Sequence, residues 1–313
     1  MGLNSPAQMV CIACNGGKAK GNLSVIQLFL RGIMAGIYIA VGAGFCTIVK
    51  TGTATFLGAG INNLLGAAVF PIGLIAIVLT GMELFTGNAM LLPMAVWSGK
   101  STWGKLLNNW TWVYLGNLVG SLAFAALMVI APFTQGALTA AEPNAFGLTA
   151  AGITVAKILP YKAAGSMGML SVFASGIGCN FIVCLAILLA MTAQDVIGKM
   201  AAIWFPIMTF VAIGFEHSVA NMYFLPAGKW IIDLYPSLLT KADAKGVAAY
   251  KGLAANGPIT WGDIWVWNII PVTLGNIVGA MIVIGATYYF CFKNEAAAID
   301  AAAAQPTGAA VSK

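Results

Sequence analysis

Long uncharged apolar runs are the feature of this chain that most restricts what it can fold into. A membrane-spanning helix needs about 20 consecutive residues that are mostly apolar. Only 8% of the 313 residues are charged, whereas a soluble domain carries roughly 25%. Apolar segments of spanning length lie near residues 24–49, 63–97, 106–132, 167–193, 200–227 and 265–292. The sequence therefore predicts an all-α membrane protein with six transmembrane helices.

The second and fifth of these segments are each interrupted by a short stretch that contains glycine and an acidic residue. Glu83 and Asn88 lie in the first interruption, and Glu216 and Asn221 take the same relative places in the second. A charged side chain that faces lipid costs at least about 2.5–3.5 kcal/mol, so we expect both carboxylates to face protein or a cavity. Broken helices of this kind are typical of a transport site near the middle of the bilayer. We therefore predict that these four residues shape two breaks, in the second and fifth helices.

An internal repeat relates the two halves of the chain. The sequence LGNLVG at 115–120 recurs as LGNIVG at 274–279, and both follow a broken segment. Each half contains three spans, and an odd number makes the second half enter the membrane in the opposite sense to the first. The sequence thus predicts two inverted three-helix repeats, at about 23–133 and 165–293, related by a two-fold axis in the membrane plane. The two breaks would then meet near the bilayer centre.

The segments outside the repeats are polar or rich in alanine. We expect an N-terminal cytoplasmic segment at 1–22, a pore domain at 23–293 and a flexible C-terminal tail at 294–313. A polar connector at 228–260 joins the last two spans. The even number of spans places both termini on one side, and the distribution of lysine and arginine slightly favours the cytoplasm. The chain is thus expected to be a multi-pass protein of the cell membrane.

His217 is the only histidine, and it lies inside the second break. Ionisable groups within a membrane mark conduction paths more often than they serve structure alone. Imidazole can offer a hydrogen-bond donor or a full charge to the anion of a weak acid. Thr86, in the first break, carries a hydroxyl that can accept from His217 or donate to a substrate. Neither break contains lysine or arginine, so the sequence predicts no fixed positive charge there.

The composition argues against metal, redox and nucleic-acid functions. The net charge of +6 is scattered rather than gathered into a basic run, so no nucleic-acid partner is expected. Cys11 and Cys14 form a lone C-x-x-C pair without the further ligands or the thioredoxin-like context of a metal or redox site. With one histidine and no spaced ligand set, no metal or other cofactor is expected. A membrane enzyme or redox subunit, resting on these two cysteines and the 14 methionines, is the weakest alternative.

Several motifs in these segments resemble the signatures of the formate–nitrite transporter family. They are ELFTGN at 83–88, CNFIVCLA at 179–186, GFEHSVANM at 214–222 and IPVTLGNIVG at 270–279, and the resemblance covers about 20–293. Members of that family are homopentamers of aquaporin-like protomers, each with its own pore. The resemblance therefore implies an aquaporin-like fold and a homopentamer for this chain.

The resemblance also implies roles for particular residues. His217 would be the central pore histidine, Thr86 its partner and Asn180 the asparagine beside the pore. The positions that match the family's two apolar constrictions are Phe70, Leu74, Leu84 and Phe210. The family's vestibule lysine is not assigned by the resemblance, because Lys157 and Lys162 both lie further upstream of the fourth span than expected.

Together with the residues, the resemblance implies transport of a small monovalent weak-acid anion, with formate as the leading substrate. Two apolar constrictions exclude a hydrated charge, so the anion would cross more readily when neutralised, which predicts proton-coupled flux that rises at acidic pH. Nitrite is the second candidate, ahead of hydrosulfide, acetate, lactate and bicarbonate. A neutral-solute channel of the aquaporin class is a different alternative, although the paired N-P-A boxes of that class are absent. The chain is not expected to be an enzyme.

Overall fold

The computed structural model describes residues 2–138, 142–240 and 258–304. Within them, six helical segments are long and apolar enough to cross a membrane. These segments are Val25–Lys50, Thr53–Thr80, Trp103–Phe133, Gly165–Thr192, Val196–Ile213 and Trp261–Ala304. The predicted six transmembrane helices are therefore confirmed. Most of the connector predicted at 228–260 lies outside the described residues.

The first half of the chain contains three spans and a short leading helix. In order, its helices are α1 (Pro6–Gly21), α2 (Val25–Lys50), α3 (Thr53–Val69), α4 (Ile72–Thr80), α5 (Phe85–Trp97) and α6 (Trp103–Met128). The second span consists of α3 and α4, and α5 is the shorter helix that follows the break. The third span ends in a π-helical turn at Val129–Phe133, which contains Pro132.

The second half repeats this order. Its helices are α7 (Ala145–Ala163), α8 (Gly165–Thr192), α9 (Val196–Ile213), α10 (Ser218–Leu234), α11 (Ser237–Thr240), α13 (Trp261–Ile264), α14 (Ile270–Val278) and α15 (Thr287–Ala304). Two π-helical segments, Trp265–Ile269 and Gly279–Ala286, join α13, α14 and α15 into the sixth span. Because α7 precedes the fourth span as α1 precedes the first, each repeat has a leading helix that the predicted boundaries left out.

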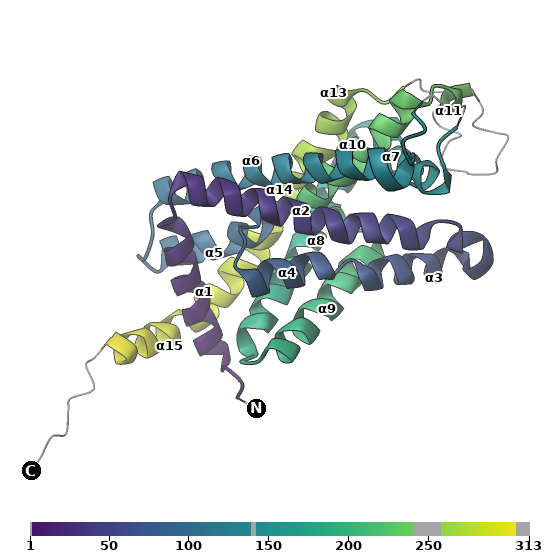
Figure 1. The fold of residues 1–313 in the computed structure, drawn as a ribbon. Helices are drawn as coiled ribbons and strands as arrows, with labels where there is room; N and C mark the ends of the chain where they lie inside the picture. The colour runs from purple at the N-terminus through teal and green to yellow at the C-terminus, as the bar shows by residue number, and fades with distance from the viewer. Residues whose placement is uncertain (1, 139–141, 241–257, 305–313) are drawn as a thin grey trace, which may run out of the picture.

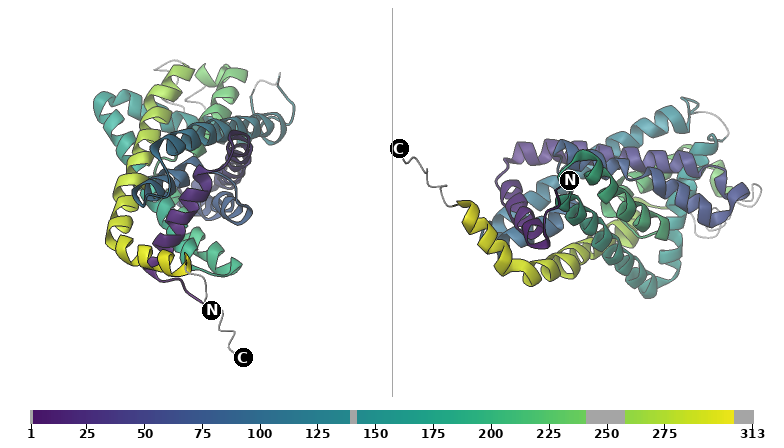
Figure 2. Two further views of the ribbon diagram at one scale, coloured as in Figure 1. Left: turned by 90° about the vertical axis from the view of Figure 1, so that its left-hand side faces the viewer. Right: turned by 90° about the horizontal axis from the view of Figure 1, so that it is seen from below.

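The two halves enter the structure from opposite ends. α1, α15 and both termini gather at one end, whereas α7, α11 and α13 lie at the other (Figure 1). α1 packs against α5 and α15 (Figure 2), and α7 packs against α10. We call these the α1 end and the α7 end. The first repeat begins at the end where the second repeat finishes, as two inverted repeats require.

The repeated L-G-N sequence lies where the first and third spans of each half cross. A Cβ on Gly116 of α6 would lie 2.5 Å from the carbonyl oxygen of Phe29 on α2, and a Cβ on Gly275 of α14 would clash in the same way with Phe173 on α8. Glycine therefore lets each pair of helices approach closely, as small residues do between membrane helices. The asparagine that follows each glycine faces the adjacent break, as described below.

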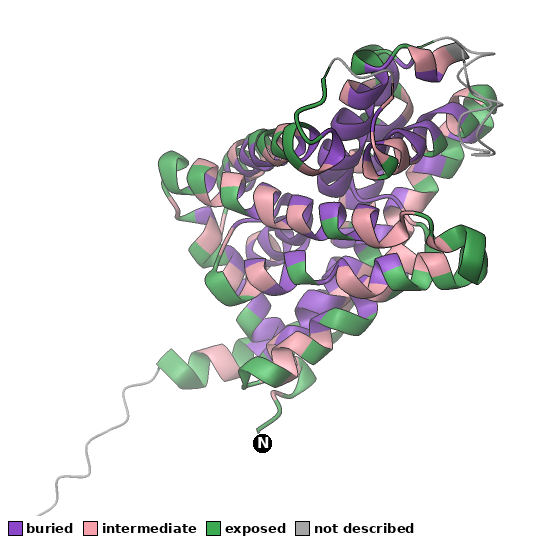
Figure 3. Ribbon diagram, turned by 45° about the vertical axis from the view of Figure 1, so that its right-hand side comes forward, coloured by how far each residue is buried: buried purple, intermediate pink, exposed green. Residues whose placement is uncertain are grey.

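Large apolar side chains cover the outer faces of the helices. Leu30, Ile130 and Phe205 are exposed over 56%, 60% and 68% of their surface, while the buried residues lie between the helices (Figure 3). Monomeric soluble proteins rarely expose large apolar patches. Such a surface suits contact with lipid or with other membrane helices.

The C-terminal helix is longer than predicted. α15 continues to Ala304, so the first part of the segment expected as a flexible tail at 294–313 is helical. Asp300 on this helix pairs with Lys100 at 2.8 Å and accepts a hydrogen bond from Asn15 of α1 at 2.9 Å. These contacts join α15 to α1 and to the turn that follows α5. Residues 305–313 lie outside the described residues.

Candidate functional site

The two breaks have the same backbone geometry. α4 and α9 each end at a glycine with left-handed dihedrals, Gly81 (φ 73°) and Gly214 (φ 87°), which a residue with a Cβ would adopt only with strain. Three residues later the chain is extended, at Leu84 (φ −110°, ψ 123°) and at His217 (φ −110°, ψ 117°). The next residue starts α5 or α10. Leu84 and His217 are therefore equivalent positions in the two halves.

In the first half, Asn117 of α6 holds the break in place. Its amide oxygen accepts a hydrogen bond from the backbone N–H of Phe85 at 2.9 Å. Its amide nitrogen donates to the carbonyl oxygens of Glu83 at 3.0 Å and Gly32 at 2.8 Å. The side chain thus satisfies backbone groups that an interrupted helix leaves without partners.

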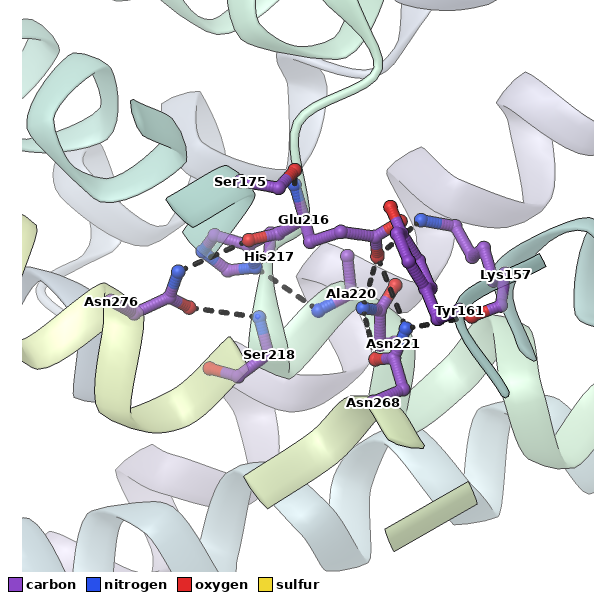
Figure 4. Close-up of polar contacts among 10 residues, drawn as sticks. All are labelled: Lys157, Tyr161, Ser175, Glu216, His217, Ser218, Ala220, Asn221, Asn268 and Asn276. Atoms are coloured by element: carbon purple, nitrogen blue, oxygen red, sulfur yellow. Dashed lines mark hydrogen bonds and ion pairs between the residues drawn. The ribbon is translucent and has the colours of Figure 1, made fainter. Parts of the chain in front are cut away.

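In the second half, Asn276 of α14 makes the same three hydrogen bonds, and Figure 4 draws those to Ser218 and Glu216. It accepts from the backbone N–H of Ser218 at 2.9 Å and donates to the carbonyl oxygens of Glu216 at 3.1 Å and Gly176 at 2.8 Å. Sequence reasoning found this asparagine as part of a repeat but gave it no role. Its role follows from its position opposite the break.

A buried carboxylate lies beside each break, where it contacts a lysine and an asparagine, and that asparagine also bonds to a second one. Glu83 pairs with Lys20 of α1 at 2.8 Å and accepts from Asn88 at 2.8 Å, and Asn88 also donates to Asn109 at 2.9 Å. Glu83 is only 2% exposed. The charge that would be costly in lipid is therefore compensated inside the protein.

Glu216 has the matching set of partners in the second half (Figure 4). It pairs with Lys157 of α7 at 2.7 Å and accepts from Asn221 at 2.6 Å, and Asn221 donates to Asn268 at 2.7 Å. The backbone carbonyls of Lys20 and Lys157 also accept hydrogen bonds from Asn109 and Asn268, each at 3.1 Å. These four contacts therefore recur in both halves, and Glu216 additionally accepts hydrogen bonds from Asn268 and from the Tyr161 hydroxyl, each at 3.4 Å.

The prediction that no fixed positive charge lies at the breaks is wrong. Lys20 and Lys157 reach the breaks from the leading helices α1 and α7, outside the segments in which charges were sought. Lys162 instead pairs with Asp263 at 2.8 Å. The signal that could have identified the lysines is the pair of intramembrane acids, since each buried carboxylate needs a cation.

Thr86 and His217 bring the two breaks together. Thr86 Oγ1 lies 3.0 Å from His217 Nε2, and both side chains are buried. His217 Nδ1 accepts a hydrogen bond from the backbone N–H of Ala220 at 3.0 Å, so it carries no proton in this arrangement. The proton of the neutral ring therefore lies on Nε2, which donates to Thr86. If Nδ1 were protonated, its N–H would face the backbone N–H of Ala220, and the hydrogen bond that caps α10 would be lost.

Asn180 of α8 bonds to the backbone next to this pair. Its amide nitrogen donates to the carbonyl oxygens of Thr86 at 3.1 Å and Asn276 at 2.8 Å. Asn180 is fully buried and lines neither of the cavities described next. It links the first break to the asparagine that holds the second.

Two cavities lie next to the Thr86–His217 pair, one lined by His217 itself and the other by Gly87, which follows Thr86. One, of about 110 Å³, is lined by residues that include Phe70, Phe210, His217 and Lys157. The other, of about 220 Å³, is lined by residues that include Leu74, Leu84 and Lys20. The four apolar residues predicted at constrictions are thus divided two and two between the cavities, and each is at most 3% exposed. The Phe70 and Phe210 rings meet edge to face, with centroids 5.9 Å apart.

Cys11 and Cys14 lie on α1, away from this site. The Cys11 thiol contacts the Asp300 carboxylate at 3.7 Å, and the Cys14 thiol contacts the Met94 carbonyl oxygen at 3.6 Å. Among the residues that the structure describes, no group of three or more His, Cys, Asp or Glu side chains could hold a metal ion. The two thiols are explained by packing between α1, α5 and α15.

Two inverted halves, whose broken helices meet at a polar pair between two cavities, define a membrane transport protein. Comparison with protein-family models agrees and is more specific. The model described as formate/nitrite transporter matches residues 7–290, so the chain belongs to the formate/nitrite transporter family. The resemblance inferred from the motifs is confirmed, and the matched proteins are transporters and channels rather than enzymes.

Several relatives and solved structures resemble the chain over most of its length. A probable formate transporter from Methanothermobacter thermautotrophicus is 36% identical over 86% of this chain and 90% of its own. The formate channel FocA from Escherichia coli (strain K12) is 33% identical over 93% of this chain and 95% of its own. A solved structure described as a pentameric formate channel with formate bound is 33% identical, covers 86% of this chain and 98% of its own, and has a TM-score of 0.68.

Proposed function

We propose that the chain is a pore for a small weak-acid anion, with formate as the principal substrate. The observation that carries the proposal is the Thr86–His217 pair, which lies between two cavities and is flanked by apolar residues. Two relatives are named as formate carriers, and they match nearly the whole chain. Nitrite remains the alternative because the family's description includes it.

The apolar residues around the pair determine the form in which a substrate crosses. Phe70 and Phe210 on one side, and Leu74 and Leu84 on the other, offer no partner for the hydration shell of an ion. Taking a carboxylate-sized ion out of water costs several kcal/mol even in a relaxed protein. The neutral acid avoids that cost. We therefore expect the anion to take up a proton before it passes the apolar residues.

The hydrogen bonds of His217 limit what it contributes. With Nδ1 occupied by the Ala220 N–H, the ring has one polar hydrogen, on Nε2. Giving that hydrogen away completely would leave an imidazolate anion, which is unfavourable in a buried site. His217 therefore serves as a hydrogen-bond donor to the passing substrate, with Thr86 as its alternate partner. The proton that neutralises the substrate enters with it from the cavity.

Positive potential at both cavities concentrates the anion first. Lys20 lines the cavity at the α1 end, and Lys157 lines the cavity at the α7 end. The N-termini of α5 and α10 lie at the two breaks. A helix N-terminus carries roughly half a positive charge. Both lysines are paired with carboxylates, so they attract an anion without binding it tightly, which favours passage.

We also propose that the protein is a homopentamer in the cell membrane with both termini in the cytoplasm. The exposed apolar faces suit contact with neighbouring protomers and lipid, and the similar solved structure is described as pentameric. Mass measurement of the detergent-solubilised complex tests the stoichiometry, and a monomer would contradict it.

Uptake into proteoliposomes tests the proposed transport. Formate should enter at a rate that rises as the pH falls, and nitrite, acetate and hydrosulfide should be compared as competitors. A swelling assay with glycerol should show no permeation. Glycerol permeation without formate flux would instead assign the chain to a neutral-solute class.

A further inference from the structure

The cavity at the α7 end contains a second lysine that the family resemblance did not single out. Lys50 is the last residue of α2, and it lines the same cavity as His217, Phe70 and Lys157. We propose that Lys50 attracts the anion into this cavity from the α7 end. Because the α1 end has no equivalent charge among the described residues, the two ends of the pore would then differ in their apparent affinity for the anion. This inference rests on the proposed function.

The first argument is charge. Lys157 faces a carboxylate at 2.7 Å, so most of its positive charge is compensated by Glu216. Lys50 makes no ion pair within the part of the chain that the structure describes, and its ammonium donates to the neutral side chain of Asn63 at 2.9 Å. The uncompensated charge in this cavity is therefore that of Lys50.

The second argument is that the structure makes room for this side chain. A Cβ on Gly66 of α3 would lie 2.6 Å from Lys50 Cγ and 2.7 Å from its Cδ. The missing side chain at Gly66 lets the aliphatic part of Lys50 lie against α3, with Asn63 one turn earlier receiving the ammonium. Lys50 is thus partly buried and held at the cavity rather than extended into solvent.

The third argument comes from the internal repeat. Asn117 bonds to the carbonyl of Gly32, and Asn276 bonds to that of Gly176, which makes these two glycines equivalent. Gln194 stands as far beyond Gly176 as Lys50 stands beyond Gly32. The equivalent residue at the α1 end is therefore uncharged, and its side chain donates to Asn4.

The two cavities consequently differ in charge. Lys20 is the one charged residue among those described that line the cavity at the α1 end, and it is paired with Glu83. The α7 end has an equivalent pair and, in addition, Lys50. An unpaired charge in a cleft with apolar walls raises the local concentration of an oppositely charged substrate. The effect falls with salt, since the screening length is about 10 Å at 0.1 M and about 3 Å at 1 M.

The test compares Lys50→Gln with the wild-type protein in oriented planar bilayers or sided vesicles, with formate added to one side at a time. We expect the half-saturating formate concentration at the α7 end to rise about 3- to 10-fold in low salt, which is at or below the lower end of the roughly 10- to 1,000-fold range for electrostatic steering because only one charge is removed. The rise should shrink in 1 M salt, and the value at the α1 end should stay unchanged. Lys50→Arg should retain the wild-type value.

Lys162→Gln is the matched control. It removes the same charge at the α7 end, but Lys162 pairs with Asp263 and does not line the cavity. Its half-saturating concentration should match the wild type. The proposal is overturned if Lys50→Gln changes neither side, changes both sides equally, or is matched by Lys162→Gln. Wild-type protein that carries no formate would refute the proposed function instead, so the two failures are distinguishable.

Discussion

Replacing Asn276 with leucine should destabilise the protein strongly without adding or removing any charge. The substitution keeps a similar side-chain size but removes the partner of the Ser218 N–H and of the Glu216 carbonyl. Neither group has a helical partner at the break. Leaving one buried polar group unsatisfied costs about 1–3 kcal/mol, so two give about 2–6 kcal/mol. The Gly176 carbonyl lies within α8 and keeps its helical hydrogen bond.

The free energy of unfolding can be measured by titrating detergent-solubilised protein with a denaturing detergent. Asn117→Leu should show the same loss, because Asn117 makes the equivalent hydrogen bonds in the first half. Asn108→Leu is the control, since Asn108 is exposed, and it should stay within about 0.5 kcal/mol of the wild type. If Asn276→Leu behaves like the control, the asparagine does not hold the break. A large difference between Asn276→Leu and Asn117→Leu would refute the equivalence of the two halves.

Three further predictions concern other parts of the site and α1. Thr86→Val should lower formate flux about 3- to 10-fold with the fold intact, because one neutral hydrogen bond contributes about 0.5–1.5 kcal/mol; unchanged flux would exclude the hydroxyl from the pathway. Lys157→Met should cost about 3 kcal/mol of stability because it leaves the Glu216 carboxylate buried without its cation, and adding Glu216→Gln should restore part of the loss. Burial, and then the Asp300 carboxylate, raise the pKa of the Cys11 thiol. Since the thiolate is the reactive form, Cys11 alkylation should be slow at neutral pH and accelerate only in alkaline solution, and labelling as fast as that of a free cysteine would contradict its burial.

The span count and the inversion could be predicted from the sequence because both are consequences of long-range regularity. A bilayer imposes one length on every crossing helix, so the apolar runs indicate the spans directly. The repeat of L-G-N then relates the halves, and an odd number of spans fixes their opposite sense. The structure adds the reason for the motif, since Gly116 permits the helix contact and Asn117 holds the break.

The ion pairs could not be predicted in the same way. Lys20 and Lys157 are separated from Glu83 and Glu216 by long stretches of chain, and they lie on helices outside the apolar segments. Nothing local in the sequence marks their partners. The burial of the acids requires some cation, but only the packing of α1 and α7 determines which one. The protonation of His217 also depends on a contact with the Ala220 N–H that periodicity does not indicate.

The central claim is that His217 donates a hydrogen bond to the substrate as it passes between the two cavities. Formate uptake by a His217→Asn variant tests this claim most directly. Asparagine is a good helix N-cap that can keep the bond from the Ala220 N–H, while its shorter side chain does not carry a donor out to the position of Nε2. A hydrogen bond between neutral groups contributes about 0.5–1.5 kcal/mol, which corresponds to about a 2- to 10-fold loss of flux. We predict a loss of that size in a variant as stable as the wild type. A variant with wild-type flux and wild-type pH dependence would contradict the account.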